Sequence, residues 1–180
     1  AHMPHFDAST ADCLLFTFKE GLLSAVAHDL KLRVTRFSID VSDDRSSVQG
    51  EFAADSLRVI AAQRDGRDDP SSLGDSDRRK IEGNIVDDVL SASRHPQIRF
   101  ASSRVQPVSG GYDVTGELSL HGQRRTLTLQ ARQKGDRLVA EVTLHQPDFG
   151  IKPYTAMLGT LRIRPDVKLQ LSLPWQPATT

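Results

Sequence analysis

The chain has 180 residues, and its 23 acidic side chains balance its 23 basic ones. This balance argues against a basic face for nucleic acid, so we expect no nucleic-acid partner. The single cysteine, Cys13, excludes an intrachain disulfide and a four-thiolate zinc site. No run of about 18 apolar residues is present, so we expect no membrane-spanning helix.

The length suits one domain, which we place at residues 14–175. Residues 1–13 are interpreted as a tag remnant followed by an N-terminal extension, with Met3 as a plausible native start. Residues 176–180 are expected to be a flexible tail, anchored by Trp175. No charged segment followed by an apolar one comes after Met3, which favours a cytoplasmic protein. The alternative is a periplasmic or secreted protein whose signal peptide was removed.

The first strand is predicted from the alternation of Leu14, Phe16 and Phe18. A short helix is predicted over about 21–28, and a second strand over 30–41 follows it. The apolar phase of that second strand slips by one residue near positions 35 and 36, which indicates a β-bulge.

The next strand is centred on Val48, Gly50 and Phe52. Residues 61–75 are polar and charged without an apolar pattern, and we expect either a mobile surface loop or a lid over a site. Residues 76–92 carry the apolar stripe of an amphipathic helix, formed by the side chains Ile81, Ile85, Val86, Val89 and Leu90.

The rest of the chain alternates with period two in five further segments, and most of them are separated by turn residues. The last segment, 161–173, is interrupted by Pro165, which suggests an edge or a bulge. About eight antiparallel strands joined mostly by hairpins can form a barrel or a sandwich. The long up-and-down strands favour a mainly β fold with a single antiparallel β-barrel.

The pair His28 and Asp29 is the sharpest chemical constellation. Catalysis would require a nucleophile and an oxyanion site, and the sequence shows neither. The two side chains either bond to nearby backbone or lie at a barrel mouth, where His145, Lys152 and Tyr154 could join them. No histidine spacing predicts a metal site, so we expect neither a metal nor a cofactor. The kinase-like triplet 148–150 is a coincidence, in which Gly150 turns the chain and Phe149 packs inward.

Four segments, taken in order after the helix, carry a resemblance to a known family. They are HPQIRFASSRV (95–105), GELSLHGQRRTLTL (116–129), HQPDFGIKP (145–153) and LRIRPDVKLQLSLPW (161–175). Together they resemble the YceI-like family of polyisoprenoid-binding proteins, over most of the chain. The resemblance implies a lipocalin-like barrel with helical segments that encloses an isoprenoid or a related amphiphile. His28 matches the family's early histidine only loosely, and the 61–75 segment departs from the family's more compact connection.

We therefore expect non-catalytic binding, carriage or storage of an apolar ligand, such as a polyprenyl lipid or an isoprenoid quinone. We also expect a homodimer, because a dimer would cover an open barrel end. The alternatives are a histidine- or metal-assisted hydrolase at His28, Asp29 and His145, and a filled barrel that presents residues 61–75 to a protein partner. The expected polar mouth is His28, Asp29, His145, Lys152 and Tyr154. The expected apolar pocket, assigned by strand parity that could be reversed on any strand, is Phe16, Phe18, Leu22, Val26, Leu32, Val34, Phe52, Val89, Phe100, Phe149, Leu161 and Ile163.

Overall fold

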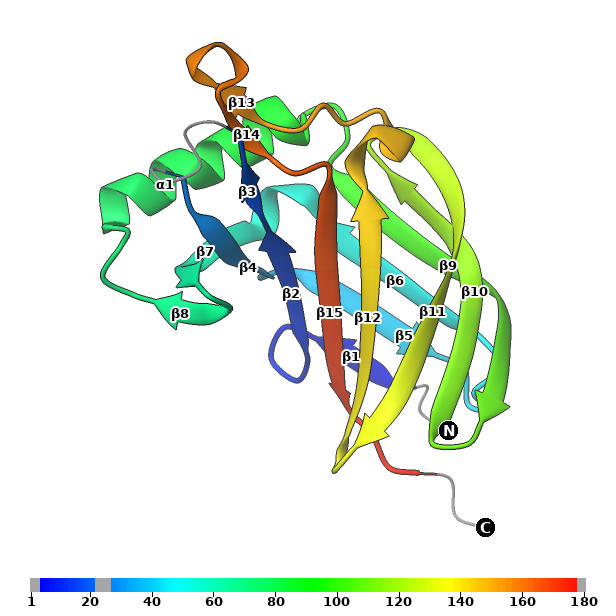
Figure 1. Ribbon diagram of the computed structural model, residues 1–180. Helices are drawn as coiled ribbons and strands as arrows, with labels where there is room; N and C mark the ends of the chain where they lie inside the picture. Colours follow the sequence, from blue (N-terminus) through cyan, green and yellow to red (C-terminus); the bar gives the residue numbers. More distant parts are fainter. Residues whose placement is uncertain (1–3, 22–26, 178–180) are drawn as a thin grey trace.

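The dominant feature of the computed structural model, which describes residues 4–21 and 27–177, is one strongly curled antiparallel sheet (Figure 1). It has twelve strands in the order β1-β5-β6-β9-β10-β11-β12-β15-β2-β4-β7-β8. The sheet forms a half-barrel, which confirms the mainly β, lipocalin-like expectation. Its strands are β1 (His5–Asp7), β2 (Asp12–Thr17), β4 (Asp29–Val34), β5 (Phe37–Val41), β6 (Val48–Ala53), β7 (Leu57–Arg64), β8 (Arg67–Asp69), β9 (Gln97–Val108), β10 (Gly111–Leu120), β11 (Gln123–Lys134), β12 (Arg137–His145) and β15 (Asp166–Pro174).

A second, small sheet lies at one end of the half-barrel. It has the order β13 (Thr155–Ala156), β14 (Leu161–Ile163) and β3 (Lys19–Glu20). Its strand β14 is separated from β15 by the break at Pro165, where the sequence predicted an interruption. Short helical turns occur at Ala54–Ser56, Gln146–Phe149 and Met157–Gly159.

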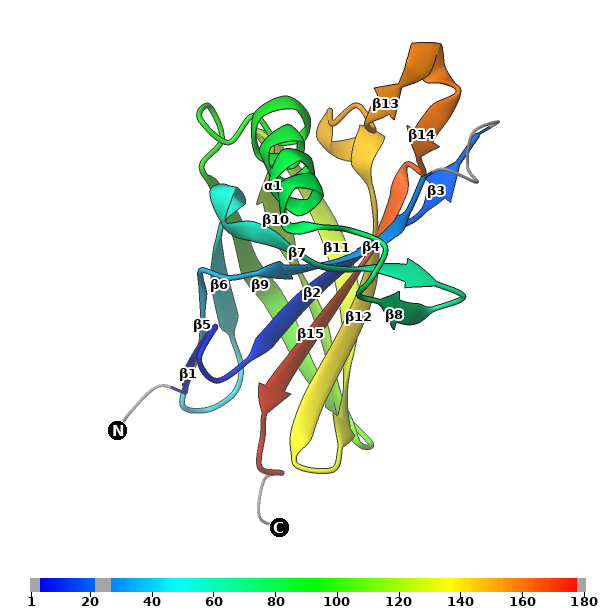
Figure 2. The same cartoon turned by 90° about the vertical axis from the view of Figure 1, so that its left-hand side faces the viewer.

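One α-helix covers the same end of the half-barrel. Helix α1 (Asp75–Asn84) continues into a π-helical turn, Ile85–Val89, so the predicted helix over 76–92 is confirmed. Figures 1 and 2 show α1 and the small sheet at one end, with the first and last described residues towards the other. The short helix predicted over 21–28 falls largely on residues 22–26, which lie outside the described residues.

The expected number of strands, about eight, is not confirmed. The predicted strand over 30–41 is split at Thr35 and Arg36 into β4, which pairs with β2 and β7, and β5, which pairs with β1 and β6. The predicted slip is therefore a corner rather than a bulge within one strand. The segment that pairs with β5 and β4 is interrupted at the same corner, because β6 pairs with β5, β7 pairs with β4, and the turn Ala54–Ser56 lies between them.

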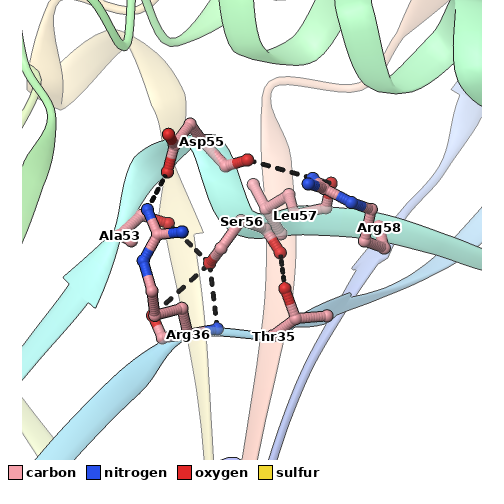
Figure 3. A network of polar contacts seen from close by, with 7 residues as sticks. All are labelled: Thr35, Arg36, Ala53, Asp55, Ser56, Leu57 and Arg58. Atoms are coloured by element: carbon pink, nitrogen blue, oxygen red, sulfur yellow. Dashed lines mark hydrogen bonds and ion pairs between the residues drawn. The ribbon is translucent and has the colours of Figure 1, made fainter.

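A hydrogen-bond network holds this corner together (Figure 3). The hydroxyl of Ser56, which is 1% exposed, donates to the carbonyl of Ala53 at 2.8 Å and accepts from the backbone N–H of Arg36 at 3.2 Å. The Thr35 hydroxyl donates to the Ser56 carbonyl at 2.7 Å, and Arg36 pairs with Asp55 at the surface. Backbone groups that the ladders leave free at the corner are thus satisfied by side chains.

The loop or lid predicted over 61–75 is wrong for most of its length. Residues up to Arg64 belong to β7, and β8 pairs back onto it. Asp65 and Gly66 connect the two strands with φ values of 53° and 76°. Positive φ at both central residues is typical of a type I′ hairpin turn, which Asp-Gly favours.

The core follows the inward faces of the curled sheet in two clusters. The larger one includes Cys13, Leu32, Ile39 and Ala62, and the smaller one is built on Leu118, Leu120, Phe149 and Ile151. Trp175 is buried at the end of the barrel away from α1. Its ring lies 6.2 Å from that of Phe6 and 5.8 Å from that of Tyr112, so the predicted anchor of the tail is confirmed. Residues 5–7, expected in the extension, form β1 at the sheet edge.

Candidate ligand-binding cavity

The half-barrel contains a cavity of about 350 Å³ at the end covered by α1, which we term the upper chamber. Its wall is almost entirely aliphatic and aromatic. Leu30, Leu32 and Val34 of β4 contribute from the sheet, and Ile81 and Ile85 from the helix. A cavity of this size lies at the lower end of the range of small-molecule sites, which are mostly apolar with few polar groups.

The polar side chains in this wall come from several elements. The Asn84 side-chain amide donates to the Tyr154 hydroxyl at 3.5 Å, which links α1 to the segment before β13. The Gln146 amide donates to the Arg164 carbonyl at 3.1 Å. His28 also faces the chamber, just before β4 begins.

Thr17, the last residue of β2, differs from these side chains. Its hydroxyl oxygen is buried in the chamber wall and has no hydrogen-bond partner among the described residues. A buried hydroxyl without a partner costs about 1–3 kcal/mol, judged from protein variants. The chamber therefore presents, within a largely apolar wall, a hydrogen-bonding group that has no partner among the described residues.

The predicted apolar residues divide into four groups. Phe16 and Phe18 line neither this chamber nor the second cavity described below, because β2 presents Cys13, Leu15 and Thr17 inward and so has the opposite parity to the one expected. Leu22 and Val26 lie outside the described residues. Phe100 lines a second cavity, described below. The upper chamber brings together Leu32, Val34, Phe52, Val89, Phe149, Leu161 and Ile163.

Of the predicted polar mouth, only His28 and Tyr154 line the chamber. Asp29 instead accepts the backbone N–H of Lys19 at 2.8 Å, as a structural bond between β4 and β3. His145 pairs with Asp166 at 2.6 Å, with both side chains about half exposed, because Leu144 takes the inward position on β12. Lys152 is exposed.

The hydrolase alternative placed His28, Asp29 and His145 at one site, and the structure does not bring them together. Among residues 4–21 and 27–177, no group of three histidine, cysteine, aspartate or glutamate side chains is arranged to hold a metal ion. Cys13 is 1% exposed in the wall, and desolvation raises the pKa of its thiol to about 12. The thiol is thus held neutral within the apolar lining.

Parity could have identified several lining residues that the prediction omitted. Leu30 shares its face of β4 with Leu32, and Ile81 and Ile85 lie on the helical stripe that includes Val89. Thr17 has the same parity as Leu15. Gln146 carried no sequence signal of this kind, because it enters the wall from a turn.

A pair of histidines supports the wall from outside. The rings of His95 and His121 lie 4.8 Å apart, and His121 Nδ1 lies 3.2 Å from the Phe149 carbonyl oxygen. Gly150 follows with a φ of 68°, as expected for the residue that turns the chain there. Phe149 is 3% exposed and packs inward, as predicted.

A smaller cavity of about 110 Å³, which we term the lower chamber, lies nearer the Trp175 end of the barrel. Ile39, Leu138 and Leu171 are among its lining residues. The interior of the half-barrel is therefore hollow in two places rather than filled, which removes the basis for the filled-barrel alternative.

These features define a class of protein, the lipocalin-like half-barrel with an apolar internal cavity. Within the described part of the chain, no helix combines the length and apolarity needed to cross a bilayer. The model of the YceI-like domain family matches residues 12–174, and the chain belongs to this family. None of the curated proteins compared with the chain matches it.

Solved structures with the same fold come from several bacteria. BcnA of Burkholderia cenocepacia is 18% identical, with a TM-score of 0.65 over 93% of this chain and 97% of that one. A polyisoprenoid-binding domain of Saccharophagus degradans, implicated in plant cell wall breakdown, is 13% identical, with a TM-score of 0.61 over 96% and 97%. The YceI protein of Campylobacter jejuni is 15% identical, with a TM-score of 0.58 over 85% and 88%.

Proposed function

We propose that this protein binds one isoprenoid-type lipid chain in the upper chamber, for carriage or storage, and catalyses no reaction on it. The observation that carries the proposal is the cavity of about 350 Å³ with an apolar wall. Burial of each CH₂ group is worth roughly 0.8 kcal/mol, so the chamber favours a hydrocarbon chain over a polar molecule of equal size. The polyisoprenoid-binding domain of similar fold supports this class of ligand.

The polar end of the ligand is assigned to the group Thr17, His28, Asn84 and Tyr154. These four residues supply hydroxyl, imidazole and amide groups to a largely apolar wall, in which the amide of Gln146 already bonds to the Arg164 carbonyl. A neutral head group with one or two oxygen atoms, such as an alcohol or a quinone, matches these donors and acceptors. Thr17 in particular would gain the partner it lacks.

Binding can be tested with a variant that blocks the chamber. Leu144 lines it, and the neighbouring Thr143 is exposed on the other face of β12. After removal of bound lipid, we expect a prenyl alcohol or prenyl quinone to bind the unmodified protein. We expect Leu144→Trp to abolish binding and Thr143→Trp to leave it unchanged.

Organic extraction and mass spectrometry of the freshly purified protein provide the second measurement. An extracted prenyl lipid would support the proposal. Absence of any lipid, together with no binding of added prenyl ligands to the unmodified protein, would refute it. Turnover of the ligand during incubation would refute the non-catalytic part alone.

A further inference from the structure

One side chain belongs to the walls of both chambers. Among the described residues, Phe52 of β6 is the one that lines both the upper and the lower chamber. Its cross-strand partners are Phe37 on β5 and Ile98 on β9. The ring of Phe52 thus forms part of the floor of the upper chamber and part of the ceiling of the lower one.

The Phe52 ring is held in place from two sides. It stacks on the ring of buried Phe37, with centroids 5.7 Å apart and planes inclined by 19°. Gly50 lies two residues earlier on the same face, and a Cβ atom there would approach Phe52 Cε2 to 2.8 Å. Because Gly50 has no Cβ atom, the Phe52 ring can occupy this space.

Arg45, Tyr112 and Trp175 line the far end of the lower chamber and contact one another. The Arg45 guanidinium lies 4.5 Å from the centroid of the Trp175 ring and donates to the Tyr112 hydroxyl at 3.2 Å and to the Gln176 carbonyl at 3.1 Å. A chain that entered from the α1 end would meet Phe52 first and the cluster of Arg45, Tyr112 and Trp175 second. The two barriers would limit its length in two steps.

We infer that Phe52 sets the length of the lipid chain that this protein accepts, and that the lower chamber is a latent subsite for one more isoprene unit. The inference rests on the proposed function. A dry cavity of about 150 Å³ holds one benzene molecule, or roughly 25 Å³ per carbon. On this scale the upper chamber takes roughly 14 carbons, close to three isoprene units, and the lower chamber roughly four more.

The test compares geraniol, farnesol and geranylgeraniol, which have two, three and four isoprene units. Each competes with one fluorescent prenyl probe for the lipid-free protein. For the unmodified protein we expect affinity to rise from geraniol to farnesol and then to level off, because the fourth unit finds no room. For Phe52→Ala we expect geranylgeraniol to bind at least tenfold more tightly than farnesol, since the joined chambers bury the extra carbons.

Leu138→Ala is the matched control, because Leu138 is buried and lines only the lower chamber. Leu138→Ala enlarges the lower chamber but leaves Phe52 in place. Its affinity should therefore still level off between farnesol and geranylgeraniol, as in the unmodified protein. Phe52→Leu gives a second variant with a smaller loss of packing, and it should shift the preference in the same direction by a smaller factor.

Two results would overturn the inference while leaving the proposed function intact. One is a continued gain in affinity from farnesol to geranylgeraniol in the unmodified protein. The other is an affinity that levels off at farnesol in Phe52→Ala and Phe52→Leu, as it does in the unmodified protein. Failure of every alcohol to bind the unmodified protein would instead remove the proposed function itself.

Discussion

Replacement of Thr17 by valine should stabilise the lipid-free protein and weaken its hold on a polar head group. Valine has nearly the same shape as threonine, so the substitution opens no cavity. The Thr17 hydroxyl is buried in the chamber wall and has no partner among the described residues. Removal of an unsatisfied buried hydroxyl recovers about 1–3 kcal/mol, and we expect a gain of about 1 kcal/mol in the free energy of unfolding.

Ligand binding should change in the opposite direction. If the ligand supplies a hydrogen bond to Thr17, its loss costs about 0.5–1.5 kcal/mol, which is roughly a two- to tenfold weaker affinity. A hydrocarbon of the same length without a head group should bind both proteins equally well. Urea denaturation of the lipid-free protein measures the change in stability. Competition binding with a prenyl alcohol and with the hydrocarbon of the same length measures the change in affinity.

Thr115→Val is the control for this substitution, because the Thr115 hydroxyl lies 3.1 Å from that of Thr128 and lines neither chamber. It should leave both affinities unchanged. A loss of stability in Thr17→Val would show that the hydroxyl is satisfied in solution. An equal loss of affinity for the alcohol and the hydrocarbon would show that Thr17 contributes shape rather than a hydrogen bond.

Three further predictions concern the wall and the corner. Gly50→Ala should lower the free energy of unfolding, measured in urea, by about 1–3 kcal/mol, because the added Cβ meets the Phe52 ring. Most of this loss should vanish when Gly50→Ala is made in the Phe52→Ala protein, and an equal loss in both backgrounds would place the strain elsewhere. Ser56→Ala should cost about 1–3 kcal/mol through its lost backbone bonds, against no more than about 0.5 kcal/mol for the exposed Ser103→Ala; equal effects would contradict this role. Because burial raises the pKa of the Cys13 thiol to about 12, iodoacetamide at pH 8 should alkylate it only after unfolding, and fast alkylation of the folded protein would show that the chamber opens to water.

Alternation along the chain was sufficient to predict most of the long strands and a mainly β, barrel-like fold, because one face of each strand is buried and the other is not. It predicted a single barrel of about eight strands, whereas the main sheet is a half-barrel of twelve. It located the break near Thr35 but not its consequence. A one-residue slip looks the same in sequence whether the strand stays in one ladder or turns a corner. Only the pairing of β4 and β5 with different strands distinguishes the two.

The hairpin at Asp65 and Gly66 was missed for a different reason. Near the turn both strands are polar on both faces, with Gln63 and Arg64 on β7 and only charged residues on the short β8, so this part carries no apolar alternation. The Asp-Gly turn signal was present, but the surrounding charges favoured a loop. For Phe16 the alternation was correct and the choice of face was not, because an outer face can also carry large apolar residues.

The cavity inside the barrel could not be predicted from the sequence pattern, and it has an energetic consequence. The alternation along a strand indicates which side chains face the barrel interior. It does not indicate whether side chains from opposite walls contact one another. At about 24 cal/mol per Å³, a void of about 350 Å³ forfeits roughly 8 kcal/mol relative to a filled interior. Since whole domains are stable by only about 5–15 kcal/mol, an interior left hollow solely by imperfect packing would be hard to maintain. A ligand that fills the upper chamber restores the lost contacts, which is why the cavity supports a lipid-binding role more strongly than any single residue in its wall.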